Sequence, residues 1–142
     1  MKYPIYSHKI KTRYAETDKM GFIHHSVYLV YLEEARTMLW EYLNYPYYKM
    51  EEEGYFVVVL SAYLDFRKPC FYGDILRIDI TNIDYKGVRF FYEYTIFNET
   101  KNYLSTFAKT EHAIINRNGK LIRIPESIYE VFTRKLSFYG IT

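Results

Sequence analysis

The stretch from residue 27 to residue 43, VYLVYLEEARTMLWEYL, decides how this chain folds. Its apolar side chains recur three and four positions apart, the spacing that places them on one face of an α-helix. They are Tyr28, Tyr31, Leu32, Ala35, Met38, Leu39, Tyr42 and Leu43. Ser26 can supply the N-cap oxygen, and Asn44 with Pro46 supplies a stop. The sequence therefore predicts one long helix with a single buried stripe.

The rest of the chain is dominated by alternating patterns that favour β structure. Strands are expected over residues 5–13, 55–66, 74–84, 88–97 and 104–115, and short helices over 47–53 and 125–135. In the strand 55–66, the even-numbered apolar residues from Phe56 to Phe66 are expected to cover the long helix. Asn118-Gly119 predicts a two-residue hairpin. We therefore expect an α+β fold in which an antiparallel sheet wraps around one central helix, with residues 1–142 forming a single domain.

Composition excludes several classes of protein. Of 142 residues, 49% are hydrophobic and 25% are charged, with only 6 Gly and 4 Pro, which excludes collagen-like and disordered chains. The 19 basic residues barely exceed the 17 acidic ones and are dispersed, so no nucleic-acid partner is expected. The lone Cys70 cannot form an internal disulfide, and no apolar run is long enough to span a membrane. The predicted location is the cytoplasm.

The loop before the long helix holds the densest group of reactive side chains, namely Glu16, Asp18, His24 and His25. The free N–H groups at the start of a helix can bind developing negative charge, and a nearby carboxylate can act as a base or nucleophile. These are the groups that acyl-group hydrolysis needs. From loop chemistry alone, an aspartate at position 18 is more often a turn or capping residue than a catalytic one.

A family resemblance is carried by residues 13–28, RYAETDKMGFIHHSVY, together with residues 31–36, YLEEAR. They resemble the signature of the 4-hydroxybenzoyl-CoA thioesterase-like hotdog family, and within it the bacterial Tol-Pal-associated acyl-CoA thioesterases. The matching positions are Asp18, Gly21, His25, Tyr28, Glu33, Ala35 and Arg36, while Glu16 stands where an Asp is common. A second block, FRKPCFYGDIL at 66–76, is similar to the Pro-x-x-x-Gly-Asp-x-Leu segment of that family.

The resemblance implies a hotdog fold and acyl-CoA thioesterase activity. Asp18 would be the catalytic base or nucleophile, and the backbone amide of His25 would help to hold the thioester oxygen. The His25 side chain is a candidate to position water or substrate, or else to bond near the helix entry. No metal and no cofactor is implied beyond the coenzyme A portion of the substrate. The family also implies a homodimer or homotetramer with the site at the subunit interface.

Further residues are expected to bind substrate. Gly21, Ser26 and Tyr28 are candidates through the resemblance, Ser61 and Tyr63 through their shared strand face, and Arg67, Lys68, Arg89 and Lys109 as partners for coenzyme A phosphates. Glu33 is the carboxylate position in another hotdog branch, but here an ion pair with Arg36 is expected. Zinc is not expected at His24 and His25, because adjacent side chains should point apart.

Two alternatives from other functional classes stay open. One is a hotdog enoyl-CoA hydratase or dehydratase, which the spacing after Asp18 disfavours because no Asn follows two residues later. The other is a non-catalytic protein that binds acyl-CoA or acyl carrier protein, since a fold alone does not establish catalysis. Acyl carrier protein in place of free coenzyme A, the length of the acyl chain and its aromatic or aliphatic character are not set by the sequence.

Overall fold

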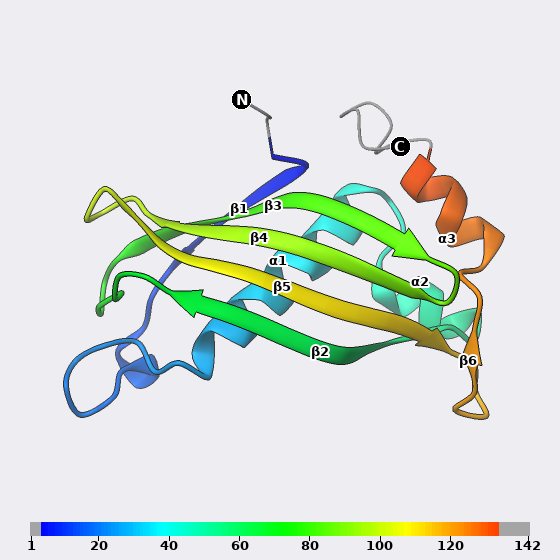
Figure 1. The fold of residues 1–142 in the computed structure, drawn as a ribbon, viewed down its shortest axis with the longest axis horizontal. Helices are drawn as coiled ribbons and strands as arrows, with labels where there is room; N and C mark the ends of the chain where they lie inside the picture. Colours follow the sequence, from blue (N-terminus) through cyan, green and yellow to red (C-terminus); the bar gives the residue numbers. More distant parts are fainter. Residues whose placement is uncertain (1–3, 134–142) are drawn as a thin grey trace.

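The computed structural model describes residues 4–133, in which one antiparallel sheet covers the long helix α1 (Val27–Tyr42) (Figure 1). The strand order is β1-β3-β4-β5-β2, with β6 paired to β5. The strands are β1 (Tyr6–Lys11), β2 (Phe56–Phe66), β3 (Ile75–Lys86), β4 (Arg89–Asn98), β5 (Tyr103–Ile115) and β6 (Leu121–Ile122). The shorter helices are η1 (Tyr14–Glu16), α2 (Tyr47–Glu52) and α3 (Glu126–Val131). The predicted α+β class and element order are confirmed.

The core lies between α1 and the sheet. The buried face of α1 includes Leu32, Ala35, Leu39 and Trp40, all at most 1% exposed. Trp40, outside the predicted stripe, packs against Phe132 with ring centroids 4.8 Å apart. The buried stripe is therefore rotated relative to the predicted one, because Phe132, which directly follows α3, also covers the C-terminal end of α1. Among residues 4–133, no helix combines the length and apolar character needed to cross a bilayer.

Strand β2 contains a β-bulge. Val59 lies opposite His112 of β5 and Ser61 lies opposite Glu111, which leaves Leu60 as an extra residue. Val57 and Leu64 consequently both pack against the core, although a regular strand would place them on opposite faces. The predicted alternation is therefore right for the second half of β2 and wrong for the first half.

The hairpin after β5 also differs from the prediction. Asn116 and Lys120 close the loop, with the Asn116 N–H donating to the Lys120 carbonyl at 3.0 Å. Three residues lie between them, and Gly119 alone has a positive φ, of 77°. This is a three-residue loop with glycine in the left-handed region, so the predicted two-residue hairpin is wrong. The last predicted helix extends to 135, and its final two residues lie outside the described range.

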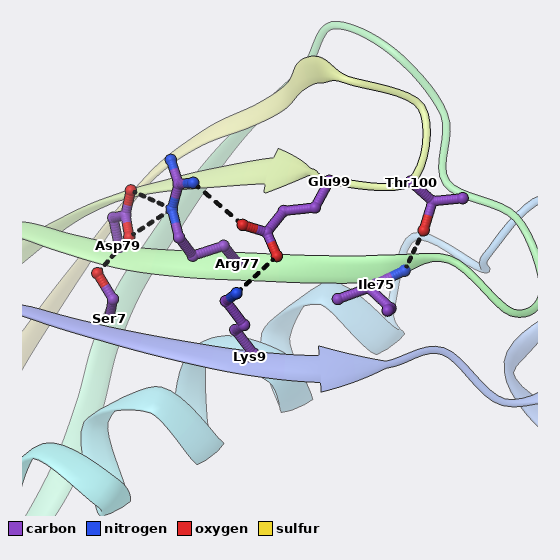
Figure 2. A network of polar contacts seen from close by, with 7 residues as sticks. All are labelled: Ser7, Lys9, Ile75, Arg77, Asp79, Glu99 and Thr100. Carbon is purple, nitrogen blue, oxygen red and sulfur yellow. Dashed lines mark hydrogen bonds and ion pairs between the residues drawn. The ribbon is translucent and has the colours of Figure 1, made fainter.

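The outer side of β1 and β3 is held by a network of charged side chains (Figure 2). Glu99 accepts from Lys9 at 3.1 Å and from Arg77 at 3.3 Å, while Arg77 also pairs with Asp79 at 3.1 Å. The Ser7 hydroxyl donates to Asp79 at 2.6 Å. The hydrogen bond from Lys9, followed by Arg77, lowers the pKa of Glu99. Charged side chains on an edge strand such as β1 discourage pairing with a further strand.

Candidate active site

Asp18 begins a tight turn at the entry to α1. Its N–H donates to the Phe22 carbonyl at 2.7 Å, and the Gly21 N–H donates to the Asp18 carbonyl at 3.1 Å. Gly21 takes a φ of 85°, the left-handed conformation that such a three-residue loop requires of its last residue. Asp18 Oδ1 accepts from the backbone amides of Met20 at 2.8 Å and Phe22 at 3.1 Å. One carboxylate oxygen therefore fixes the turn.

The other carboxylate oxygen, Oδ2, makes no hydrogen bond or ion pair with any residue in the range 4–133. Asp18 lines an open cleft of about 410 Å³, the Asp18 cleft. Its walls come from the turn, the start of α1 and the end of β2, and comprise Asp18, Phe22, Ile23, His25, Tyr28, Phe66, Arg67, Lys68 and Pro69. Asp18 thus fixes the turn through Oδ1, lines the cleft and keeps Oδ2 free of partners among the described residues.

The start of α1 provides an uncommitted amide beside this cleft. The His25 N–H has no hydrogen-bond partner among the described residues, whereas the His24 N–H donates to the Glu16 carbonyl at 2.9 Å. The Ser26 side chain does not cap the helix, so that prediction is wrong. Its hydroxyl instead lies 2.8 Å from His24 Nδ1, and it is absent from the cleft wall. The backbone donor expected at His25 is therefore free to bind an oxyanion.

Glu16 anchors the whole loop, a role that the sequence analysis did not assign. Its carboxylate accepts from the Tyr31 hydroxyl at 2.7 Å and from the Arg13 backbone amide at 2.8 Å. The side chain is 11% exposed. The sequence feature that could have indicated this role is Tyr31, a hydrogen-bond donor on the buried face of the helix that follows the loop. Through its carbonyl contact with His24, Glu16 fixes the loop on both sides of Asp18.

Two buried groups stay protonated here, Tyr28 in the cleft wall and Cys70 outside it. Burial raises the pKa of Tyr28, and it also raises the pKa of the Cys70 thiol. Cys70 is fully buried and donates to the Ser105 hydroxyl at 3.2 Å. A raised pKa and a buried sulfur leave little thiolate to act as a nucleophile.

The predicted cationic residues separate into two groups. Arg67 and Lys68 line the Asp18 cleft. Arg67 pairs with Asp65 at 2.7 Å, whereas the Lys68 ammonium lies over the Tyr103 ring at 5.0 Å and has no carboxylate partner among residues 4–133. Lys68 is thus the more available of the two for a phosphate group.

The remaining predicted binding residues lie elsewhere. Ser61, Tyr63 and Lys109 line a separate hollow on the outer face of the sheet. Ser61 donates to Glu111 at 2.9 Å, and Arg89 pairs with the same carboxylate at 2.8 Å. The structure therefore does not bring these four residues to Asp18 within one chain.

Two expected arrangements of side chains are wrong. Glu33 and Arg36 form no ion pair within the described chain, because Arg36 is buried and bonds to the Tyr94 hydroxyl while Glu33 stays exposed. The rings of His24 and His25 do not point apart but stack, with centroids 4.2 Å apart. Within residues 4–133, no group of three His, Cys, Asp or Glu side chains gathers at a metal-binding distance.

Comparison with known proteins places the chain in a family. The sequence model of a family described as the thioesterase-like superfamily matches residues 12–132. A protein of Aquifex aeolicus (strain VF5) named "Putative esterase" is 35% identical over 121 residues, covering 85% of this chain and 92% of that one. A Bacillus subtilis (strain 168) protein named "Putative acyl-CoA thioesterase YneP" is 35% identical over 111 residues, covering 78% and 80%.

The fold is shared with solved thioesterases. The DHNA-CoA thioesterase from Staphylococcus aureus superposes with a TM-score of 0.86 at 31% identity, covering 95% of this chain and 93% of that one. The predicted hotdog fold and family are therefore confirmed. The closer likeness to the Tol-Pal-associated branch stays a prediction.

Proposed function

The chain belongs to the thioesterase-like superfamily and is a thioester hydrolase, and from that premise we propose that it hydrolyses acyl-CoA thioesters to a free acid and coenzyme A. The observation that carries this proposal is that one cleft is lined both by Asp18, whose Oδ2 is free, and by His25, whose N–H is uncommitted among the described residues. The names of the relatives support the thioester as substrate. The geometry supports Asp18 as the group that acts on it.

The proposed chemistry needs only these two groups. A thioester carbonyl is electrophilic and its thiolate leaves readily, so a carboxylate can either activate water or attack the carbonyl to form an anhydride. The His25 N–H, at the positive end of α1, would donate to the oxygen as negative charge develops on it. Lys68 at the cleft wall would meet a phosphate of coenzyme A.

We test this proposal with Asp18→Asn. The amide oxygen of Asn can still accept from the Met20 and Phe22 amides, so the turn is retained while the charge is lost. Release of free thiol from a panel of acyl-CoA substrates should fall by about 10²–10⁴-fold. Asp84→Asn, an exposed aspartate outside the cleft, is the matched control and should keep full activity.

Other outcomes distinguish the alternative functions. Hydration of an enoyl-CoA without thiol release would assign a hydratase. Tight binding of acyl-CoA without turnover at any chain length would assign a binding protein. Equal rates for Asp18→Asn and the wild type would remove Asp18 from the mechanism.

The two edges of the sheet differ in a way that supports a dimer. Edge strand β1 carries Lys9 and the charged network of Figure 2, which discourage pairing. Edge strand β2 instead exposes Val59, Leu60, Tyr63 and Phe66. An exposed apolar edge favours pairing with another strand, and in a symmetric dimer the same strand of a second copy pairs antiparallel. Light scattering should report a dimer, which Leu60→Lys should weaken.

A further inference from the structure

A second cavity, of about 190 Å³, lies between α1, α2 and the first half of β2, and we call it the Arg36 cavity. Its polar lining includes Arg36 and His112, and its walls include Tyr47, Tyr55 and Val59. It is separate from the Asp18 cleft, with which it shares no residue. The proposed reaction within one chain does not use it.

Arg36 is an unusual group to find in such a place. It is 6% exposed, and no carboxylate of the described chain lies within ion-pair distance of it. Its one hydrogen bond runs from Nη1 to the Tyr94 hydroxyl at 3.2 Å. A guanidinium has five N–H donors, and a buried charge is costly unless it is paired. Tyr47, another cavity residue, also contacts the guanidinium, and the donors of Arg36 that neither tyrosine uses are available to a group in the cavity.

A chain of hydrogen bonds from Arg36 determines which ring nitrogen of His112 carries the hydrogen. Because Arg36 can only donate to the Tyr94 oxygen, the Tyr94 hydroxyl must donate onward, and its partner is Thr110 Oγ1 at 2.5 Å. The Thr110 hydroxyl needs an acceptor of its own, and we assign that role to His112 Nε2, which lies 2.7 Å away. A neutral imidazole that accepts at Nε2 carries its hydrogen on Nδ1.

His112 Nδ1 is thus a donor without an acceptor. It is the one buried side-chain polar atom in residues 4–133 that has no hydrogen-bond partner, and the residue is fully buried. Burial, followed by the charge of Arg36, lowers the pKa of His112 to about 3, which keeps the ring neutral. The Val58 backbone lies close enough to the ring to oppose this shift, as does the charge of Glu111, but no contact of Nδ1 within residues 4–133 meets hydrogen-bond geometry. An unmet buried donor destabilises the folded chain, and a ligand oxygen that accepts from it would remove that cost.

The cavity selects the chemistry of its occupant. Arg36 and His112 both offer donors, so the occupant needs an oxygen acceptor. Glu33 and Glu51 also line the cavity and disfavour a group with two negative charges. A cavity of about 150 Å³ can hold benzene, so this one has room for one six-membered ring or a short chain bearing one hydroxyl or carbonyl oxygen.

The arrangement of β2 connects this cavity to catalysis. Val59 lines the Arg36 cavity and Phe66 lines the Asp18 cleft, seven residues apart and therefore about 20 Å along the strand. This separation is too long for a compact acyl group within one chain. Antiparallel pairing of β2 with β2 of a second copy brings the start of one strand beside the end of the other.

We propose that Arg36 and His112 of one copy form the acyl-recognition end of the site whose Asp18 belongs to the other copy, and that they select acyl groups carrying an oxygen acceptor. This inference rests on the proposed dimeric thioesterase. The two N–H donors bind the oxygen of the acyl group, while the thioester lies at Asp18 of the neighbouring copy. No bond is made or broken at Arg36 or His112, so both are specificity-determining residues.

Binding to the wild-type protein tests the cavity without any turnover. Phenol and toluene have the same shape, but only phenol has an oxygen. Phenol should shift the ¹⁵N resonance of His112 Nδ1 and toluene should not. In Arg36→Met the dissociation constant for phenol relative to that for toluene should rise about tenfold. Arg123→Met, at an exposed arginine outside the cavity, should leave this ratio unchanged. Equal binding of phenol and toluene by the wild type would overturn the inference, even if Arg36→Met failed to fold.

Kinetics test the link to catalysis. The preference in kcat/KM for 3-(4-hydroxyphenyl)propanoyl-CoA over 3-phenylpropanoyl-CoA should fall about tenfold in Arg36→Met and in His112→Phe. A preference that persists in both variants would overturn the inference while leaving the thioesterase intact. If phenol binds but no thioester is cleaved, it is the proposed function that fails.

A mixing experiment tests the assignment to two copies. In a hybrid dimer of Asp18→Asn with Arg36→Met, one site receives both intact residues if they come from different copies. The preference for the hydroxylated substrate should then return on mixing. If each site is built from a single copy, mixing leaves the low preference of Arg36→Met unchanged.

Discussion

The contact between Glu16 and Tyr31 holds the Asp18 loop against α1, and its removal has a calculable cost. Tyr31 is 4% exposed, so in Glu16→Ala its hydroxyl loses a charged acceptor with little water to replace it. A hydrogen bond to a charged group contributes about 1.5–3 kcal/mol. The Arg13 amide is exposed and can bond to water instead. We expect a loss of about 2 kcal/mol in the free energy of unfolding.

The loss is measured by denaturant unfolding and by calorimetry. For a chain of 142 residues, about 2 kcal/mol corresponds to a decrease of about 7 °C in Tm. Because Glu16 also holds His24 through its carbonyl, a loosened loop should lower kcat as well as stability. Glu16→Gln retains an acceptor for Tyr31 and should lose less than Glu16→Ala.

A double-mutant cycle with Tyr31→Phe isolates the contact. If the hydroxyl and the carboxylate stabilise the protein through one another, the two losses will not add, and the coupling energy should be about 1–2 kcal/mol. Additive losses, with a coupling below about 0.5 kcal/mol, would refute the reasoning. In that case Glu16 would act only through its backbone.

Three further perturbations have defined outcomes. Gly21→Ala and Gly119→Ala both place a side chain at positive φ with nothing within 4 Å of the new Cβ, so each should cost about 1–2 kcal/mol, but only Gly21→Ala should also lower kcat. The pKa of His112 is 6.5 in the unfolded chain and about 3 in the folded one, so between these values only the unfolded chain binds the proton. The free energy of unfolding should therefore decrease as the pH falls from 6.5 to about 3, by at most about 1.4 kcal/mol per pH unit. Denaturant titrations of His112→Gln should show a shallower pH slope. Glu99→Gln should lower Tm at low salt, and the difference should disappear at about 1 M NaCl, where screening reaches about 3 Å.

Local periodicity was sufficient to predict the elements of the fold. The start of α1 at Val27 and the end of β2 at Phe66 agree with the expected ranges, because regular spacing and turn residues act within a few positions. The bulge at Leu60 could not be predicted in this way. It depends on which residues of β5 lie opposite, a contact between segments about 50 residues apart.

The candidate site was predictable as a motif but not as a geometry. The resemblance named Asp18 and His25, and the structure brings both to one cleft. The same motif contains Arg36, which the sequence paired with Glu33 through helical spacing. Arg36 is instead buried against Tyr94, because packing against the sheet determines which face of the helix is covered, and this contact is not visible in the local spacing.

The single extra residue in β2 has a consequence for how the protein can change during evolution. Val59 and Phe66 are an odd number of positions apart, so only the insertion at Leu60 lets both ends of the strand look toward the helix. Deletion of Leu60 would turn the residues of β2 at one of the two sites, the Asp18 cleft or the Arg36 cavity, to the outer face of the sheet, although every residue of the family motif would be kept. The strand can therefore gain or lose residues at this point only two at a time. A relative whose sequence has a gap of one residue here would have the Asp18 cleft and the Arg36 cavity on opposite faces of the sheet.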